Sequence, residues 1–199
     1  ASIASPAGRS GAKAARGAWS ASTGRRIEMP ALAPFTLVLG GQRSGKSAFA
    51  ERMFARHLPA LYLATAEARD AEMAARIAAH RARRGSDWET IEEPLEIARI
   101  LAAAPRPALI ECLSLWVSNL LEQKRDPASE TDALIAAVRA RARPTVAVSV
   151  EAGLGVVPAN ALARAWLDAL GVTNQKIALA ADRVVLVTAG LPLILKGTP

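Results

Sequence analysis

The sequence predicts a single α/β domain with a parallel sheet and helices on both of its faces. From residue 35 onward, short apolar runs alternate with longer Ala-rich segments, which is typical of parallel strands joined by crossover helices. The chain has 199 residues, of which 51% are hydrophobic, and this suits one domain with one core. A glycine-rich motif lies between the first apolar run and the first helical segment, where α/β proteins bind phosphate groups.

The first half of the domain contains four expected strands separated by helices. Residues 35–39 form an apolar run, and residues 88–92 alternate in polarity as a half-buried strand does. Gly85 closes one helical stretch, and Pro94 opens the next. The four strands are expected at residues 35–39, 61–64, 88–92 and 108–110. The helices between them are expected at residues 48–56, 69–84 and 94–101.

The second half continues the same alternation. Asp126-Pro127 is expected to separate two helical stretches, because proline disfavours a helical conformation in the residue before it. A later helix is expected to be interrupted near Gly171. The helices are expected at residues 113–124, 130–141 and 159–181, and the strands at 145–150 and 183–188.

The glycine-rich motif is a complete phosphate-binding loop, G-x-x-x-x-G-K-[ST], between a strand and a helix. Its glycines let several backbone N–H groups face phosphate oxygens, and the helix N-terminus adds a partial positive charge. We expect Lys46 to reach the β- and γ-phosphates and Ser47 to ligate Mg²⁺. The motif therefore predicts a fold of the P-loop NTPase type that binds ATP or GTP. Its residues are Gly40, Gly41, Gln42, Arg43, Ser44, Gly45, Lys46 and Ser47.

A second candidate ligand for Mg²⁺ is Glu111, which follows three apolar residues of an expected strand. Ligands collect at the carboxyl ends of parallel strands, where this carboxylate would join Ser47. The alternative is an ordinary exposed acid. Cys112 beside it is either a nucleophile or a small buried residue, and the second interpretation is favoured because free cysteines are usually buried.

A charged constellation lies on the helix expected at residues 69–84. Glu72, Arg76 and His80 are spaced four apart, so they share one helix face, and further arginines follow His80. Such a face is often merely solvated. A histidine can also hold a phosphoryl or nucleotidyl group, and neighbouring arginines would keep its imidazole neutral.

The net charge of +7 is uneven, because the first 28 residues contain five arginines and lysines and a single acid, Glu28. We expect residues 1–28 to be a disordered extension, with a translated upstream segment or a transit peptide as alternatives. No basic and aromatic platform for nucleic acid is visible. No apolar run approaches the ~18 residues of a membrane span. The single Cys112 suits a reducing cytoplasm.

The combination of motifs resembles the bifunctional adenosylcobinamide kinase/adenosylcobinamide-phosphate guanylyltransferase family of cobalamin biosynthesis. The resemblance runs in order from about Leu37 to Lys196. Besides the phosphate-binding loop, it is carried by Leu61-Tyr62-Leu63-Ala64-Thr65, Asp70-x-Glu72-Met73-x-x-Arg76-Ile77-x-x-His80, Trp88-x-Thr90-x-Glu92, Glu111-Cys112-Leu113, Ser118-Asn119-Leu120-Leu121, Glu151-x-Gly153-x-Gly155-x-Val157-Pro158 and Asn174-Gln175.

The resemblance implies two reactions at one nucleotide site. ATP or GTP phosphorylates adenosylcobinamide; a histidine, here His80, then takes GMP from GTP and passes it to adenosylcobinamide phosphate, giving adenosylcobinamide-GDP. It also implies a homo-oligomer, a trimer. The catalytic residues it implies are His80 and Lys46. The implied nucleotide contacts outside the phosphate-binding loop are Ala64, Thr65, Ala66, Arg81, Ala82, Arg83, Arg84, Glu92 and Glu111.

Three residues depart from the family's usual pattern, namely Val150, Val172 and Lys176. A switch GTPase is excluded because the N-K-x-D guanine motif is absent from the sequence. The remaining alternative is a monofunctional small-molecule kinase, which would use the same loop and Glu111 while His80 had no role.

Overall fold

The computed structural model describes residues 31–68, 70–83 and 85–198, so the expected extension at residues 1–28 lies outside the described residues. Within these ranges the chain forms one seven-stranded sheet in the order β3-β2-β4-β5-β1-β6-β7. The first six strands in this order are parallel, and β7 pairs antiparallel with β6. The strands are β1 (Phe35–Gly40), β2 (Ala60–Ala64), β3 (Trp88–Glu92), β4 (Ala108–Glu111), β5 (Thr145–Val150), β6 (Arg183–Thr188) and β7 (Leu191–Lys196).

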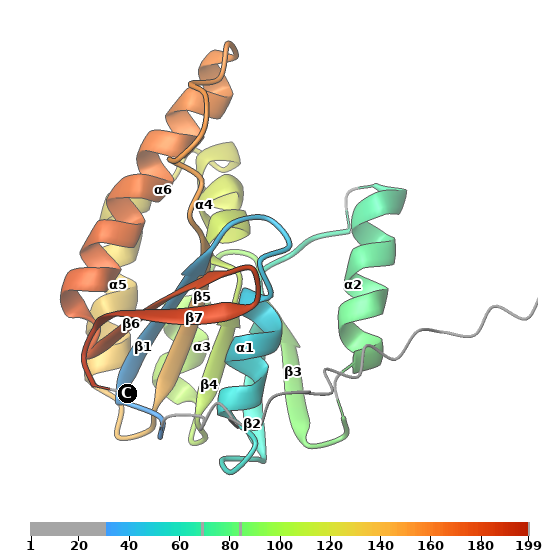
Figure 1. Cartoon of the computed structure of the whole chain (residues 1–199), viewed down its shortest axis with the longest axis vertical. Helices are drawn as coiled ribbons and strands as arrows, with labels where there is room; N and C mark the ends of the chain where they lie inside the picture. Colours follow the sequence, from blue (N-terminus) through green and yellow to red (C-terminus); the bar gives the residue numbers. More distant parts are fainter. Residues whose placement is uncertain (1–30, 69, 84, 199) are drawn as a thin grey trace, which may run out of the picture.

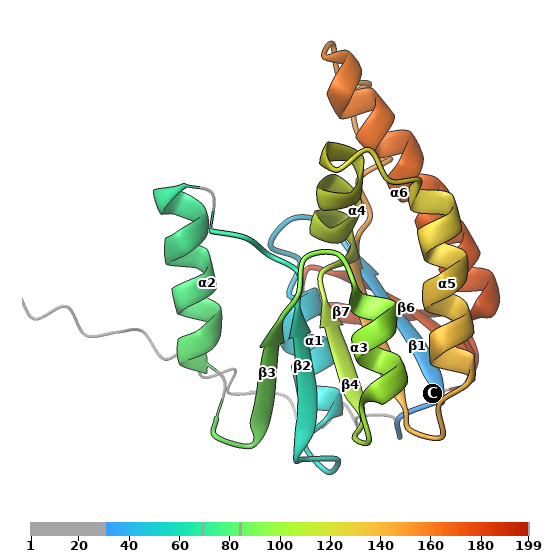
Figure 2. The same ribbon diagram turned by 180° about the vertical axis from the view of Figure 1, so that it is seen from behind.

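Helices cover both faces of the sheet, as the alternation predicts (Figures 1 and 2). One face carries α1, and the opposite face carries α3, α5 and α6. The helix α2 lies apart from these layers, beyond the edge strand β3 (Figures 1 and 2). The helices are α1 (Lys46–Met53), α2 (Ala71–Arg83), α3 (Ile97–Ala103), α4 (Leu113–Glu122), α5 (Pro127–Arg139) and α6 (Ala161–Ala180).

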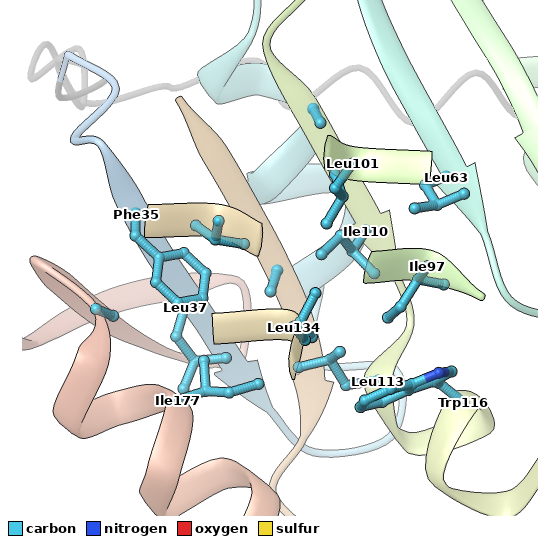
Figure 3. Close-up of a cluster of buried hydrophobic side chains, with 14 of the residues drawn as sticks. Phe35, Leu37, Leu63, Ile97, Leu101, Ile110, Leu113, Trp116, Leu134 and Ile177 are labelled. Atoms are coloured by element: carbon cyan, nitrogen blue, oxygen red, sulfur yellow. The ribbon is translucent and has the colours of Figure 1, made fainter. Parts of the chain in front are cut away.

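The hydrophobic core has two parts because both faces of the central strands are buried. On one face, Phe49 and Met53 of α1 pack on valines of β1, β5 and β6. On the other, Leu37 of β1 and Ile110 of β4 belong to the larger cluster, together with side chains of α3 to α6 (Figure 3). This double burial explains why the central strands read as continuous apolar runs rather than alternating ones.

Several helix boundaries differ from those expected. The helix α3 begins at Ile97 rather than Pro94, because the Glu93 carboxylate accepts hydrogen bonds from the N–H groups of Leu95 and Glu96, at 3.0 Å each. These bonds hold a turn ahead of the helix. The helices α1 and α4 each end earlier than expected, at Met53 and Glu122.

The helix α5 begins at Pro127, not at residue 130. Asp126 caps it by accepting hydrogen bonds from the N–H groups of Ala128 and Ser129, and proline occupies the first turn, where its missing N–H costs nothing. Asp126-Pro127, which we expected to separate two helices, therefore forms the start of α5.

Two further differences concern the C-terminal third. The helix α6 runs without interruption through Gly171, because its packing on α5 and α4 outweighs the weak helix propensity of one glycine. The strand β7 was not expected from the sequence. Its Pro192 weakens the strand signal, and proline is tolerated there because β7 is an edge strand.

Candidate nucleotide-binding active site

The loop between β1 and α1 has the geometry that its glycines predict. A side-chain carbon at Gly40 would lie 2.6 Å from the Val187 carbonyl oxygen, so only glycine fits against β6. Gly45 has φ of 93°, in the left-handed region that favours glycine, and it directly precedes α1. The loop therefore places the N-terminus of α1 at the carboxyl edge of the sheet.

Lys46 lies in the first turn of α1 and is only 8% exposed. Its ammonium nitrogen lies 3.4 Å from the Gly41 carbonyl oxygen, so the side chain folds back over the loop. In this position the charge faces the space that the loop encloses, where a triphosphate would be neutralised.

Ser47 and Glu111 are brought together from distant parts of the sequence. The Ser47 hydroxyl donates to Oε1 of Glu111 at 2.6 Å. A hydroxyl and a carboxylate are the hard oxygen donors that Mg²⁺ prefers, so this pair fits the ion that the motif implies. In the described part of the chain no cluster of three or more His, Cys, Asp or Glu residues could hold a metal. Mg²⁺ usually keeps several waters and binds substrate phosphates besides one or two protein ligands.

A cavity of about 540 Å³ opens in front of the loop. It brings together most of the residues that the sequence singled out, including His80 from α2, Glu92 from β3 and Glu111 from β4. The other predicted residues that line it are Gln42, Arg43, Ser44, Gly45, Lys46, Ser47, Ala64 and Ala66.

One face of α2 forms a wall of this cavity. Met73, Ile77 and His80 are spaced four and three residues apart, so they share a face, and all three line the cavity. The side chains of Glu72 and Arg76, expected on the same face as His80, lie outside the described residues. The imidazole of His80 is thus presented to the same space as the phosphate-binding loop.

Several expected contacts do not line this cavity. Thr65 is fully buried and bonded to the chain after β4, and Gly40 and Gly41 shape the loop without lining the space. Arg81 pairs with Glu92 beside a neighbouring cavity of about 340 Å³. Ala82 is exposed and lines neither cavity; Arg84 and the Arg83 side chain lie outside the described residues.

The cavity also contains residues that the sequence reasoning did not assign to the site. Tyr62 and Val150 come from the strands β2 and β5, and Ser114 and Leu115 come from the start of α4. The strand positions could have been found, because each lies within two residues of the carboxyl end of an expected strand. The α4 residues carry no such signal, since only the packing of that helix brings them to the cavity.

Cys112 is buried, which confirms the interpretation as a small core residue. Burial, together with the neighbouring Glu111 carboxylate, raises the pKa of the Cys112 thiol, and the hydrogen bond with Ser114 only partly opposes this. A raised pKa keeps the sulfur protonated near neutral pH, where the thiol is a poor nucleophile.

The three departures from the family pattern have different surroundings. Val150 lines the cavity, and its carbonyl oxygen accepts a hydrogen bond from the Asn174 side chain. Lys176 joins α6 to α5 by pairing with Asp132 at 2.7 Å, away from the cavity. Val172 lies on α6 and is half-exposed.

A strand, a phosphate-binding loop and a helix at the carboxyl edge of a parallel sheet define a nucleotide-binding protein of the P-loop type. The family model described as cobinamide kinase / cobinamide phosphate guanyltransferase matches residues 36–195, and this chain belongs to that family.

Curated relatives agree with this assignment. The chain is 47% identical to the bifunctional adenosylcobalamin biosynthesis protein CobP of Pseudomonas aeruginosa over 171 residues, which cover 82% of this chain and 98% of the relative. It is 37% and 39% identical to the proteins named CobU from Escherichia coli and Salmonella typhimurium, over 80% of this chain and 98% of each relative. Among the described residues, no helix is long and apolar enough to cross a membrane.

Proposed function

We propose that this enzyme performs both reactions of its family at the single cavity in front of the phosphate-binding loop. The first reaction phosphorylates adenosylcobinamide with ATP or GTP, and the second transfers GMP from GTP to adenosylcobinamide phosphate. The observation that carries the proposal is that the loop, Glu111 and His80 all line one cavity of about 540 Å³. That arrangement lets one bound triphosphate meet either an acceptor hydroxyl or a protein nucleophile.

In the kinase step, the chain positions the triphosphate and stabilises its charge. Lys46 and the loop N–H groups bind phosphate oxygens, and the substrate hydroxyl is held in line with the γ-phosphorus. Ser47 and Glu111 are the residues that would hold Mg²⁺, which when bound neutralises charge on the phosphates. No protein nucleophile is needed for this transfer.

In the guanylyl step, the nucleophile is a nitrogen of the His80 imidazole. Its lone pair forms a bond to the α-phosphorus of GTP while the bond to the bridging oxygen of the β-phosphate breaks, and pyrophosphate leaves. The loop amides and Lys46 stabilise the departing charge. A phosphate oxygen of adenosylcobinamide phosphate then attacks the same phosphorus, which releases the imidazole and gives adenosylcobinamide-GDP.

Mass spectrometry of the intact protein after incubation with GTP and Mg²⁺ tests this proposal. A bifunctional enzyme gains the mass of one GMP group, and the adduct disappears when adenosylcobinamide phosphate is added. A protein that never gains this mass while it still phosphorylates adenosylcobinamide would be a monofunctional kinase.

The same proposal includes a homo-oligomer, a trimer by resemblance, that works in the cytoplasm without nucleic acid. The oligomer is supported by apolar side chains on the segment between β5 and α6 and on the first turn of α6. The helix α6 extends beyond the sheet (Figure 1). Leu154, Val156 and Val157 are 86%, 95% and 75% exposed, and Leu162 is 68% exposed. Such a patch is typical of a protein–protein contact, and the mass of the particle in solution by light scattering tests the assembly.

A further inference from the structure

Thr65, the residue after β2, is bonded to the chain that follows Glu111 rather than directed into the cavity. Its hydroxyl donates to the Cys112 carbonyl oxygen at 2.8 Å and accepts from the Cys112 N–H at 2.9 Å. Its own N–H donates to the Glu111 carbonyl oxygen at 2.9 Å. Thr65 is fully buried, so these three bonds are shielded from competing water.

Thr65 is itself held by a side chain of α4. The Asn119 amide donates to the Thr65 carbonyl oxygen at 2.9 Å and to the Pro94 carbonyl oxygen at 3.1 Å. Asn119 is almost fully buried. The segments that follow β2, β3 and β4 are therefore tied to one another directly above the strand ends.

The bonded segment is the one whose conformation decides where the Glu111 carboxylate points. Glu111 ends β4, and α4 begins two residues later at Leu113. Cys112 lies between them and gives α4 no side-chain cap. The carboxylate of Glu111 in turn accepts the hydrogen bond from Ser47 at 2.6 Å. Through Cys112, the Thr65 hydroxyl thus acts on the oxygen pair that would hold Mg²⁺.

We infer that Thr65 is a positioning residue that fixes the Glu111 carboxylate for metal binding, and not a nucleotide contact. The inference rests on the metal role of Glu111 in the proposed function. Outer-shell groups of this kind orient a metal-binding carboxylate, and their loss lowers metal affinity without removing a ligand.

Thr131 provides a matched control that separates a role of Thr65 in metal binding from a purely structural one. Thr131 on α5 is also fully buried, and its hydroxyl donates to the Pro127 carbonyl oxygen at 2.6 Å. It lies 3.2 Å from the Thr173 hydroxyl of α6, within the helical layer. Thr131→Val therefore removes a buried hydroxyl that has no connection to Glu111.

The experiment measures Mn²⁺ binding to the full chain in the presence of a non-hydrolysable GTP analogue, from the electron paramagnetic resonance signal of free Mn²⁺. Thr65→Val should weaken Mn²⁺ binding about tenfold or more, the effect typical of an outer-shell partner, whereas Thr65→Ser keeps the hydroxyl and should retain wild-type affinity. Thr131→Val should lower the melting temperature and leave Mn²⁺ affinity unchanged. Where Thr65→Val does not fold, Thr65→Ala removes the same hydroxyl with less bulk.

A double-mutant cycle with Glu111→Gln shows whether Thr65 acts through Glu111. If it does, Thr65→Val causes no additional loss of Mn²⁺ affinity once Glu111 is replaced. Wild-type Mn²⁺ affinity in Thr65→Val, or an equal loss with and without Glu111, would overturn the inference. Unchanged Mn²⁺ binding by Glu111→Gln alone would be a different result, because it would remove the metal role of Glu111 from the proposed function.

Discussion

Lys46 contributes a nearly buried positive charge at the point where both proposed reactions place a triphosphate. Its contact with the Gly41 carbonyl oxygen is long, at 3.4 Å, so phosphate oxygens can replace it at little cost. The interaction that Lys46 makes with a bound nucleotide is a charge-assisted one, the strongest kind of hydrogen bond available to the site.

Lys46→Met should abolish both reactions, because phosphoryl and guanylyl transfer use the same loop. Losing a charge-assisted contact costs several kcal/mol in the transition state, which is roughly 10³-fold or more in rate. Steady-state assays of each reaction measure this. Lys176→Met, a control that removes the pair with Asp132, should change neither rate. A Lys46→Met protein that forms the GMP adduct at the normal rate would show that the two reactions use separate sites.

At the residue scale, the sequence predicts the site well where a motif links spacing to chemistry. The loop from Gln42 to Ser47, Glu111 and His80 are such residues, and all of them line the cavity. Thr65 shows the limit: it lies at the right strand end, but the direction of its side chain depends on the Cys112 backbone, which is distant in sequence. Position along the chain does not determine which way a side chain points.

At the scale of elements, α5 depends on a cap that carries a charge. Hydrogen bonds donated by the N–H groups of Ala128 and Ser129 hold the pKa of Asp126 below its ordinary value. A carboxyl group with a lowered pKa in the folded state stabilises the fold when ionised. This contribution is complete above the ordinary pKa of aspartate and is lost as the pH falls through the lowered one.

Asp126→Ala should therefore melt below the wild type at neutral pH, and the gap should narrow as the pH falls into the acid range. Thermal unfolding followed by circular dichroism across this range measures it. Asp126→Asn keeps a neutral acceptor, so the melting temperature of Asp126→Asn should approach that of the wild type at acid pH. A gap between Asp126→Ala and the wild type that stays constant with pH would show that the charge of the cap contributes nothing.

Gly171 lies in the interior of α6, and a side-chain carbon there would contact nothing within 4 Å. Gly171→Ala should stabilise the protein by about 0.5–1 kcal/mol, because alanine loses less backbone entropy in a helix. The melting temperature should rise by roughly 1–4 °C for a domain of this size. Gly197→Ala is the opposite case, since its φ of 86° and the Asp182 carbonyl at 2.6 Å leave no room. A lower melting temperature for Gly171→Ala would contradict the packing described for α6.

The sequence predicts the type and the succession along the chain of β1 to β6 and of α1 to α6 in the described residues, because buried parallel strands and helices have strong patterns. It does not predict where α3 and α5 begin, since a turn held by the Glu93 carboxylate delays the start of α3 and the Asp126 cap sets the start of α5. It also misses β7, whose pairing with β6 depends on a partner strand rather than on its own composition.

At the scale of the whole molecule, the strand order explains why the site is formed from distant segments. The strand β5 lies between β1 and β4 and pairs with both in parallel. The carboxyl ends of these strands therefore meet at one edge, and Ser47 and Glu111 come within hydrogen-bonding distance across 64 residues of sequence.

The family match begins at residue 36, so the domain should not need the first 28 residues. Deleting residues 1–28 should leave the melting temperature and both activities unchanged, because this segment lacks the apolar periodicity of a packed element. A deletion of residues 1–33 is the informative comparison. It removes the Ala31 carbonyl oxygen, which accepts a hydrogen bond from the guanidinium of the nearly buried Arg183 at 2.6 Å. This longer deletion should therefore lower the melting temperature. A drop of more than a few degrees for the shorter deletion would show that the segment packs on the domain.

The central claim is that one cavity supports two chemistries, and that only the second requires His80. Labelling with GTP that carries ³²P at the α-phosphorus tests it most directly, in the wild type, in His80→Ala and in His57→Ala as the control for the other histidine. We expect acid-labile, alkali-stable label on the wild type and on His57→Ala but none on His80→Ala, while all three proteins still convert adenosylcobinamide to its phosphate. Undiminished labelling of His80→Ala would place the nucleophile elsewhere and contradict the account.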